Sequence, residues 1–297
     1  MIDYAAARAV AMVVRLGSFE AAARALGVTP SAVSQRVRQL EERLGTVLIM
    51  RGTPCVATDK GARLCRHMDH VGLLEQDLHD HLPGLGAAPQ VTIPIATNAD
   101  SLGTWFMPAL AAHARTGGHL LSIALDDEDH TADWLRRGQV LAAVTAVAQP
   151  VHGCSVTPLG ALRYVATASP AYVHRHFPEG VTAAALARAP ALTFNQKDSL
   201  QQDWVRQGFG EGIVLPTHWL PSTQAFVEAS LAGMGWALIP VQLARAHLDA
   251  GRLVELAPCR WLDRALFWQV SRLAARSLSA LTQAVVAAAR QDLVRPG

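Results

Sequence analysis

The sequence predicts an α/β protein in which a small helical N-terminal unit and one long helix precede a larger domain of alternating strands and helices. Three observations support this prediction. Apolar residues recur at helical spacing over residues 4–44, and a single helical pattern covers 59–82. From residue 91 onward strand patterns alternate with helical patterns, which is typical of a parallel sheet. With 297 residues, 51% of them apolar, the chain can form more than one hydrophobic core.

Charge is distributed unevenly along the chain. The net charge is only +2, but residues 1–66 carry a surplus of five positive charges and residues 67–297 a surplus of three negative charges. A basic N-terminal unit on a mildly acidic body favours a nucleic-acid contact at that end.

Composition also limits the class of protein. The four cysteines are scattered without a CxxC pair, so we expect neither a disulfide framework nor a zinc site. No run of eighteen apolar residues is present and the N-terminus lacks a signal-peptide pattern. We therefore expect a cytoplasmic protein with no membrane partner.

The first 44 residues predict three helices. The predicted helices and the glycines that end them are 4–15 with Gly17, 19–26 with Gly27, and 31–44 with Gly45. Thr29-Pro30 places an N-cap residue and a proline directly before the third helix. Two helices joined by so short a turn are typical of a helix-turn-helix, whose second helix enters the major groove of DNA.

The third helix has one apolar and one polar side. Val33, Val37, Leu40 and Leu44 form a buried stripe. The opposite side carries short or planar polar side chains suited to base edges and phosphates. A hairpin over 47–57 follows as a wing, with Arg51 able to reach a phosphate or the minor groove. The candidate DNA-binding residues are Thr29, Ser31, Ser34, Gln35, Arg36, Arg38, Arg51 and Thr58. The alternative is a three-helix bundle that binds another protein.

The helical pattern over 59–82 begins after Thr58 and ends at Pro83-Gly84, and a hinge follows over 85–89. Its apolar positions form a short, imperfect heptad pattern, which predicts pairing with a second copy. The candidate dimerisation residues are Leu64, Met68, Val71, Leu78 and Leu82. The alternative is a helix packed on its own domain. The histidines at 67, 70, 79 and 81 lack convincing ligand spacing, so we expect no metal.

The domain after residue 90 is interpreted as a binding domain rather than an enzyme, because no nucleophile-elbow, Walker, dinucleotide or HExxH motif is present. In such folds ligands bind at the carboxyl ends of strands and at helix N-termini. The candidate effector-binding residues are Asn98, Asp100, Ser101, Asp126, Asp127, Glu128, Thr145, Ser222 and Thr223. Helix N-termini at Ser101 and Ser222 suit a carboxylate, and the acidic residues suit cations. An amino acid with a basic side chain satisfies both, although the acidic run can equally be a solvated loop.

The chain resembles the LysR-type transcriptional regulators. The resemblance lies in Gly17-Ser18-Phe19-Glu20-Ala21-Ala22-Ala23, the segment from Val28 to Gln35, Leu40-Glu41-Glu42-Arg43-Leu44-Gly45, Arg51, Thr58 and Gly61. In the larger domain the residues 96–102, 125–128, 135–138, 159–162, 176–182 and 225–227 are similar to the ArgP/LysG branch of that family. Thr223-Gln224 departs from the Ser-Glu pair expected there.

This resemblance implies a winged helix-turn-helix over 1–58, a linker and dimerisation helix with hinge over 59–89, and an effector domain over 90–297. It implies two lobes like a periplasmic solute-binding protein, lobe I at about 90–161 and 268–297 and lobe II at about 162–267. The chain would cross between them near Gly160 and return near Trp268.

The implied partners are double-stranded operator DNA, RNA polymerase and further copies in a homodimer or homotetramer. No cofactor is implied other than the effector, lysine or arginine, which in this branch activates a basic-amino-acid exporter gene. Two alternatives stay open: a regulator responding to a different small carboxylate, and an effector-independent nucleoid or replication-origin binding protein.

Overall fold

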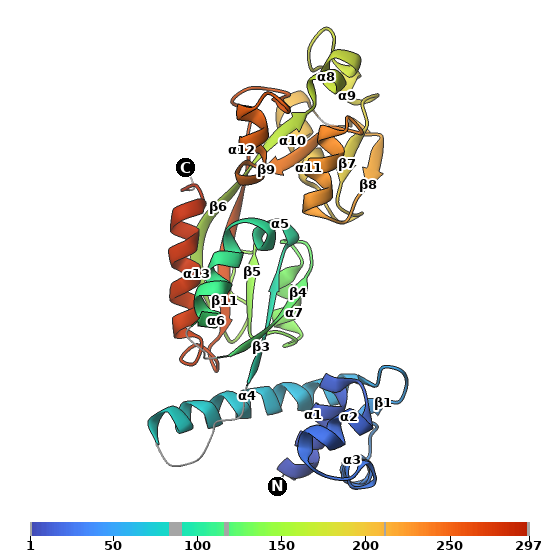
Figure 1. The fold of residues 1–297 in the computed structure, drawn as a ribbon, viewed down its shortest axis with the longest axis vertical. Coiled ribbons are helices and arrows are strands. Elements are labelled where there is room, and N and C mark those ends of the chain that lie inside the picture. Colours follow the sequence, from blue (N-terminus) through green and yellow to red (C-terminus); the bar gives the residue numbers. More distant parts are fainter. Residues whose placement is uncertain (1, 83–90, 116–118, 211, 296–297) are drawn as a thin grey trace.

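The computed structural model describes residues 2–82, 91–115, 119–210 and 212–295. Figure 1 shows an N-terminal head (residues 2–58), a long helix that runs from the head beneath the rest of the molecule, and a C-terminal domain of two lobes. The predicted fold class is confirmed. The hinge predicted over 85–89 lies outside the described residues.

The head consists of three helices and a two-stranded wing. Its elements are α1 (Tyr4–Leu16), α2 (Phe19–Leu26), α3 (Pro30–Leu44), β1 (Ile49–Met50) and β2 (Val56–Ala57). Asp3, Ser18 and Thr29 accept hydrogen bonds from the backbone in the first turn of each helix. The helix boundaries agree with the prediction to within about one residue, because caps and glycines define them locally. The first wing strand, β1, covers only the second half of the apolar run 47–50, whereas the return strand β2 lies where it was predicted.

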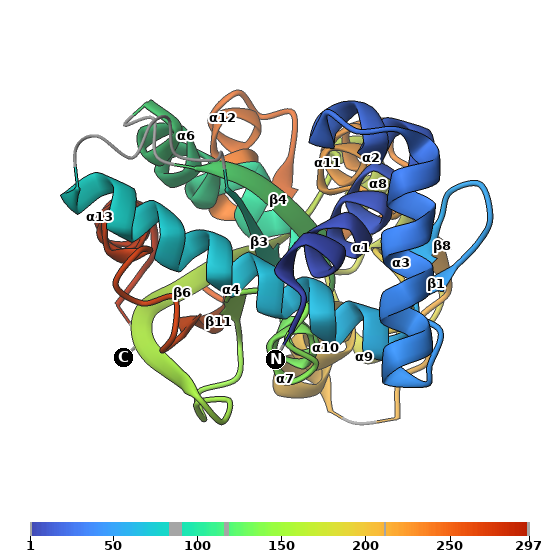
Figure 2. The same cartoon turned by 90° about the horizontal axis from the view of Figure 1, so that it is seen from below.

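The long helix α4 (Asp59–His81) is joined to the head through its first turns. Thr58 caps it, and its hydroxyl also donates to the Val47 carbonyl at 2.8 Å. Gly61 lies so close to the wing that a Cβ there would be 1.9 Å from the Leu48 carbonyl oxygen. One carboxylate oxygen of Glu41 accepts the Leu48 and Ile49 amides at 2.7 and 3.2 Å, which fixes the wing to α3. Figure 2 shows α4 crossing beneath the C-terminal domain.

Lobe I has a parallel three-stranded centre. Its elements are β3 (Thr92–Thr97), α5 (Ala99–Ser101), the π-helical turn η1 (Leu102–Phe106), α6 (Met107–Arg115), β4 (Leu120–Leu125), α7 (Thr131–Arg136), β5 (Ala142–Thr145) and α13 (Ser279–Asp292). β3 pairs in parallel with both β4 and β5. The expectation that Ser101 caps the helix after β3 is wrong. Asn98 is the cap, because its side chain accepts the Ser101 amide at 3.2 Å.

Lobe II is built from shorter elements. They are α8 (Pro170–His176), α9 (Ala183–Leu186), β7 (Ala191–Thr193), α10 (Leu200–Phe209), β8 (Thr217–Trp219), α11 (Thr223–Leu231), β9 (Ala237–Pro240), α12 (Val241–Asp249) and β10 (Val254–Glu255). β7 pairs in parallel with β8, whereas β9 and β10 pair antiparallel with β6 (Cys154–Ala168). The predicted cap at Ser222 is confirmed, since its hydroxyl accepts the Ala225 amide.

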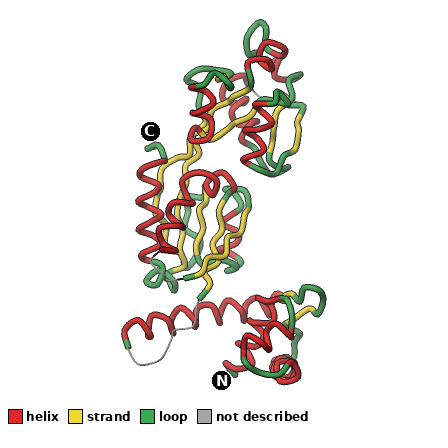
Figure 3. Tube along the Cα trace, in the orientation of Figure 1, coloured by secondary structure: helices red, strands yellow, loops and turns green. Residues whose placement is uncertain are grey.

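Two long strands connect the lobes. β6 and β11 (Leu262–Ser271) pair antiparallel through both of them, as Figure 3 shows. Their register shifts between Leu266 and Phe267, and Leu266 faces Gly160. Gly160 has φ +127°, and Val294 is hydrogen-bonded both ways to Ala161 beside it. In the described ranges no helix is long and apolar enough to cross a lipid bilayer.

Candidate functional site

The polar side of α3 faces outward from the head. Val33, Val37 and Leu40 are buried against α1 and α2. Ser31, Gln35 and Arg38 are exposed and Ser34 is half-buried. Arg38 forms an exposed ion pair with Glu42 at 2.9 Å, which costs little to break. The candidate DNA-binding side chains of α3 therefore lie on one accessible face.

The remaining DNA-binding candidates differ in exposure and in the contacts that their side chains make within the head. The hydroxyls of Thr29 and Thr58 are engaged as helix caps. The Arg51 guanidinium lies 5.2 Å from the centre of the Phe19 ring, on the exposed wing. Arg36 is half-buried in a hollow shared with α1, on the flank of the polar face. Ser31, Ser34, Gln35 and Arg38 thus form the compact centre of the candidate DNA surface.

The predicted dimerisation residues divide into two groups along α4. Leu64 and Met68 pack partly buried against the core of the head, and Val71, the next predicted residue along the helix, is half-buried. Leu78 and Leu82 are each 51% exposed, and Leu74, on the same half of the helix, is 64% exposed. The division arises because the head covers only the first half of a 23-residue helix. The second half leaves leucines uncovered in this chain.

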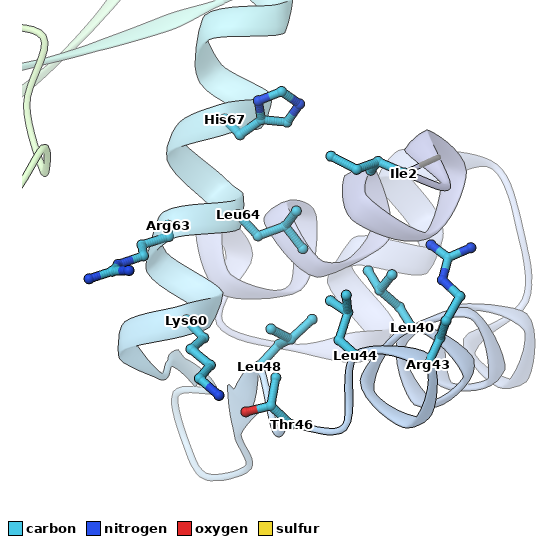
Figure 4. A pocket seen from close by; sticks show the side chains of 10 residues that line it. All are labelled: Ile2, Leu40, Arg43, Leu44, Thr46, Leu48, Lys60, Arg63, Leu64 and His67. Atoms are coloured by element: carbon cyan, nitrogen blue, oxygen red, sulfur yellow. The ribbon is translucent and has the colours of Figure 1, made fainter.

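A hollow of about 690 Å³ lies between α3, the wing and α4 (Figure 4). Leu44, Leu48 and Leu64 point into it from three elements. Arg43, Lys60 and Arg63 lie at its rim. The hollow is apolar at its centre and basic at its edge. The first turns of α4 form one of its walls.

The predicted effector residues meet where the two lobes face each other. A small cavity there is lined by Asn98, Ala99, Asp100, Asp126, Asp127, Glu128, Phe194, Asp198, Leu200 and Phe226. Its volume of about 30 Å³ has room for one or two water molecules. The lining combines five carboxyl groups with an apolar wall, in which the rings of Phe194 and Phe226 meet edge to face.

Asp100 joins the lobes from the floor of the cleft. Its carboxylate accepts hydrogen bonds from the hydroxyls of Tyr164 at 2.8 Å and Thr223 at 2.5 Å. Burial raises the pKa of this carboxyl, although the two hydrogen bonds oppose that shift. Thr223 therefore positions Asp100 and does not itself line the cavity.

The acidic loop after β4 is partly desolvated. Burial, together with the charge of Asp127, raises the pKa of Glu128 to about 8. Burial also raises the pKa values of Asp127 and, on lobe II, Asp198. Asn98 donates to Glu128 at 3.0 Å, and the Arg264 guanidinium lies 3.9 Å from it. Carboxyl groups are concentrated here, and a bound cation would favour their ionised form.

The pKa of Asp126 is shifted in the opposite direction from those of Asp127 and Glu128. Burial raises its pKa, but hydrogen bonds from the Trp134 indole and the Lys197 ammonium outweigh burial, so the pKa is lowered. Lys197 belongs to lobe II and lies 3.0 Å from the Asp126 carboxylate. Asp126 is thus an ionised carboxylate already paired with a lysine.

Besides Thr223, three predicted effector residues do not line the cavity. Ser101 is fully buried beneath it, and within the described residues its hydroxyl has no hydrogen-bond partner. The buried Thr145 hydroxyl donates to the Glu128 carbonyl at 3.0 Å and so supports the acidic loop from below. Ser222 is exposed and caps α11.

The lobe II residues that line the cavity are not among the predicted effector residues. Phe194, Lys197, Asp198 and Leu200 follow β7, and Phe226 lies in α11. The strand-end rule that selected Asn98 and Asp126 applies equally to the segment after β7. Applied there, it would have found Phe194 and Asp198.

An exposed polar recognition helix joined to a two-lobed domain with a charged cleft defines a ligand-responsive, DNA-binding regulator of transcription. Residues 5–62 match the model of bacterial regulatory helix-turn-helix proteins of the lysR family, and residues 87–294 match the LysR substrate-binding domain. The chain belongs to the LysR family of transcriptional regulators.

Known members of the ArgP/LysG branch are similar over nearly the whole chain. LysG from Mycobacterium tuberculosis is 43% identical over 97% of this chain and 96% of its own. The crystal structure of ArgP from Mycobacterium tuberculosis aligns with a TM-score of 0.81 at 42% identity, covering 100% of both chains. Full-length LysG from Corynebacterium glutamicum with its effector arginine bound aligns with a TM-score of 0.70 at 38% identity, covering 99% of this chain and 100% of its own.

Proposed function

We propose that this protein is a one-component sensor that binds arginine or lysine between its lobes and operator DNA through α3, and that it controls a basic-amino-acid exporter gene. It acts in the cytoplasm through DNA and RNA polymerase, and not as an enzyme. The observation that carries the proposal is the cleft itself, in which Asp100, Asp127, Glu128 and Asp198 gather around one cavity beside an aromatic wall.

The chemistry of the cleft matches each part of a basic amino acid. Carboxylates attract the side-chain cation and the α-ammonium group. Phe194, Leu200 and Phe226 offer apolar contact to the aliphatic stem. The N-terminus of α11, a nine-residue helix beside the cleft, favours the α-carboxylate. The arginine bound in LysG from Corynebacterium glutamicum supports the same ligand class.

The size of the cavity supports a coupling between binding and movement. A space of about 30 Å³ is far smaller than an amino acid, so the lobes have to separate or rearrange before the effector enters. An effector that binds one arrangement better than the other shifts the population toward it. That shift is the signal we propose reaches the DNA.

The DNA-binding form is proposed to be a homodimer or a homotetramer. The exposed leucines of α4, Leu74 and Leu78, and the apolar hollow at Leu44 and Leu64 offer surfaces that a second copy can cover. Two heads then present two α3 helices to successive major grooves of an operator with two half-sites.

Calorimetric titration of the full-length protein tests the effector class. We expect arginine and lysine to bind, and their uncharged isosteres citrulline and norleucine to bind at least about tenfold more weakly, because buried carboxylates would be left without a cation. Asp127→Asn should weaken arginine binding, whereas Asp133→Asn, an exposed carboxyl on α7, should not. Tight binding of an uncharged or dicarboxylic acid in place of arginine would overturn the proposal.

A duplex selected from a random pool by the wild-type protein tests the DNA surface. We expect Arg38→Ala and Ser34→Ala to weaken binding of that duplex by about tenfold or more without changing arginine affinity. Arg188→Ala, an exposed arginine of lobe II, serves as the control for loss of charge alone. Normal DNA binding by both α3 variants would refute the assignment of α3.

A further inference from the structure

One ion pair spans the mouth of the cleft. The Lys197 ammonium, from the loop between β7 and α10, lies 3.0 Å from Oδ1 of Asp126, which directly follows β4 in lobe I. The Lys197 side chain is 52% exposed and the Asp126 side chain 21%. The exposed ammonium therefore contacts a half-buried carboxylate that lines the cavity.

Both partners are held in position by their own lobes. The Asn195 side chain accepts the Lys197 amide at 2.7 Å, and the Asp198 carboxylate accepts the amides of Phe194 and Leu200. On the other side, Asp126 accepts the Trp134 indole at 3.0 Å and the Asp127 amide at 2.9 Å. The loop and the carboxylate are fixed, so the flexible lysine stem is the part of this contact that can move away.

The cation in this contact is the same chemical group as the side chain of one proposed ligand. An ammonium on a four-carbon stem is the side-chain group of free lysine, and Asp126 is the carboxylate of the acidic loop whose pKa is lowered. The neighbouring Asp127 and Glu128 have no comparably short contact with a cation in the described part of the chain.

We propose that Lys197 is an internal cation that pairs with Asp126 until the cationic end of the effector displaces it. The inference rests on the proposed function, because it assumes a basic amino acid as ligand. Lys197 then sets how much effector is needed for a response: the effector gains the Asp126 contact only by breaking the pair with Lys197.

Titration of arginine into the full-length wild type and Lys197→Met tests this role. Methionine keeps an apolar stem and removes the charge. An exposed ion pair of this kind is weak, so we expect about two- to fivefold tighter arginine binding by the variant. The gain should shrink in high salt, since screening weakens the pair. Lys197→Arg, which keeps the cation, should stay close to the wild type.

A double-mutant cycle separates displacement from simple repulsion of a cationic ligand. In an Asp126→Asn background the effect of Lys197→Met should disappear, because the pair no longer exists. Arg206→Met, which removes a cation paired with Asp203 outside the cavity lining, is the matched control and should leave arginine affinity unchanged.

Unchanged or weaker arginine binding by Lys197→Met would overturn the role of Lys197 while leaving the proposed function intact. A full effect of Lys197→Met in the Asp126→Asn background would overturn it as well. If neither the wild type nor the variants bind arginine or lysine, the proposed function itself fails, so the two failures are distinguishable.

Discussion

Gly61 is a single residue on which the joint between the head and α4 depends. It lies in the first turn of α4, and its amide donates to the capping Thr58 hydroxyl at 3.1 Å. A methyl group at this position would lie 1.9 Å from the Leu48 carbonyl oxygen and 3.2 Å from the Leu48 Cα. Both are backbone atoms of a segment that Glu41 holds to α3, so the wing or the helix has to shift.

We therefore predict that Gly61→Ala destabilises the head by roughly 2 kcal/mol or more. All seven tryptophans lie between Trp105 and Trp268, so their fluorescence reports the C-terminal domain alone. The variant should lower the thermal transition of the head followed by circular dichroism and leave the tryptophan transition in place.

Gly27→Ala is the matched control for this prediction. Gly27 has φ +65°, but a Cβ there would meet no atom within 4 Å. Its cost is that of a left-handed alanine, about 1 kcal/mol. Equal losses in the two variants would contradict the steric explanation for Gly61.

At the residue scale the sequence identified one side of the cleft. Asn98, Asp126 and Glu128 follow strands whose apolar patterns are plain, so the strand-end rule located them. The same rule covers the loop after β7 that contains Lys197, but it does not predict the contact of Lys197 with Asp126. Its partner is 71 residues away on the other lobe, and the contact depends on how the lobes close.

Among the elements, α4 packs against both the head and the C-terminal domain. Its first half covers the head through Leu64 and Met68, and Leu73 is buried in the core of the C-terminal domain. The exposed leucines between and beyond these contacts are Leu74, Leu78 and Leu82. A seven-residue repeat alone does not show which leucines of α4 pack within the chain and which are free to pair with a second copy. Both kinds of contact need the same apolar residues at the same spacing.

We predict that Leu74→Asp combined with Leu78→Asp shifts the protein toward monomer, since a charge in an apolar interface is costly to desolvate. Sedimentation over a range of protein concentrations measures the shift. Leu273→Asp changes a leucine that is 73% exposed in the C-terminal domain and should leave the assembly unchanged. Unaltered sedimentation of the α4 variant would show that this half of α4 does not pair.

Some short elements were not predicted. β8 has three residues, too few to display an alternating pattern. β6 extends from Cys154 to Ala168, although Pro158 and Gly160 interrupt its apolar pattern. Helices with clear caps, such as α3 and α11, were predicted almost to the residue.

For the whole molecule, the acidic cleft makes stability depend on pH. Burial raises the pKa of Glu128 from 4.5 to about 8, so the folded chain holds a proton that the unfolded chain has already lost in this range. The contribution of Glu128 to stability is present below pH 4.5 and is lost as the pH rises through about 8. Arginine binding, which favours the ionised carboxylates, should become tighter over the same rise.

We predict that the tryptophan-monitored melting temperature of the wild type falls between pH 6 and pH 8.5 by at least about 2 °C more than that of Glu128→Gln. Glutamine keeps the hydrogen-bonding shape and has no proton to lose. Parallel pH profiles for the two proteins would show that Glu128 is ionised throughout.

The order of the two lobes along the chain could be anticipated only through resemblance to a family. Alternating strands and helices predict a parallel sheet, and β3, β4 and β5 form one. Nothing in that alternation indicates that β6 and β11 leave lobe I and continue into lobe II. Their pairing joins residues as far apart as Cys154 and Ser271.

The crossing strands also limit how the lobes can move. β6 and β11 stay hydrogen-bonded through the crossing and shift register beside Gly160, where Val294 pairs with Ala161. A hydrogen-bonded ladder of this kind resists bending within its own plane, whereas twisting and bending out of that plane leave its hydrogen bonds in place. Entry of a solute should therefore turn one lobe relative to the other by a small angle. A small rotation within one chain would move the DNA-binding head little. Contacts between neighbouring subunits would have to convert it into a larger displacement of the heads on the DNA.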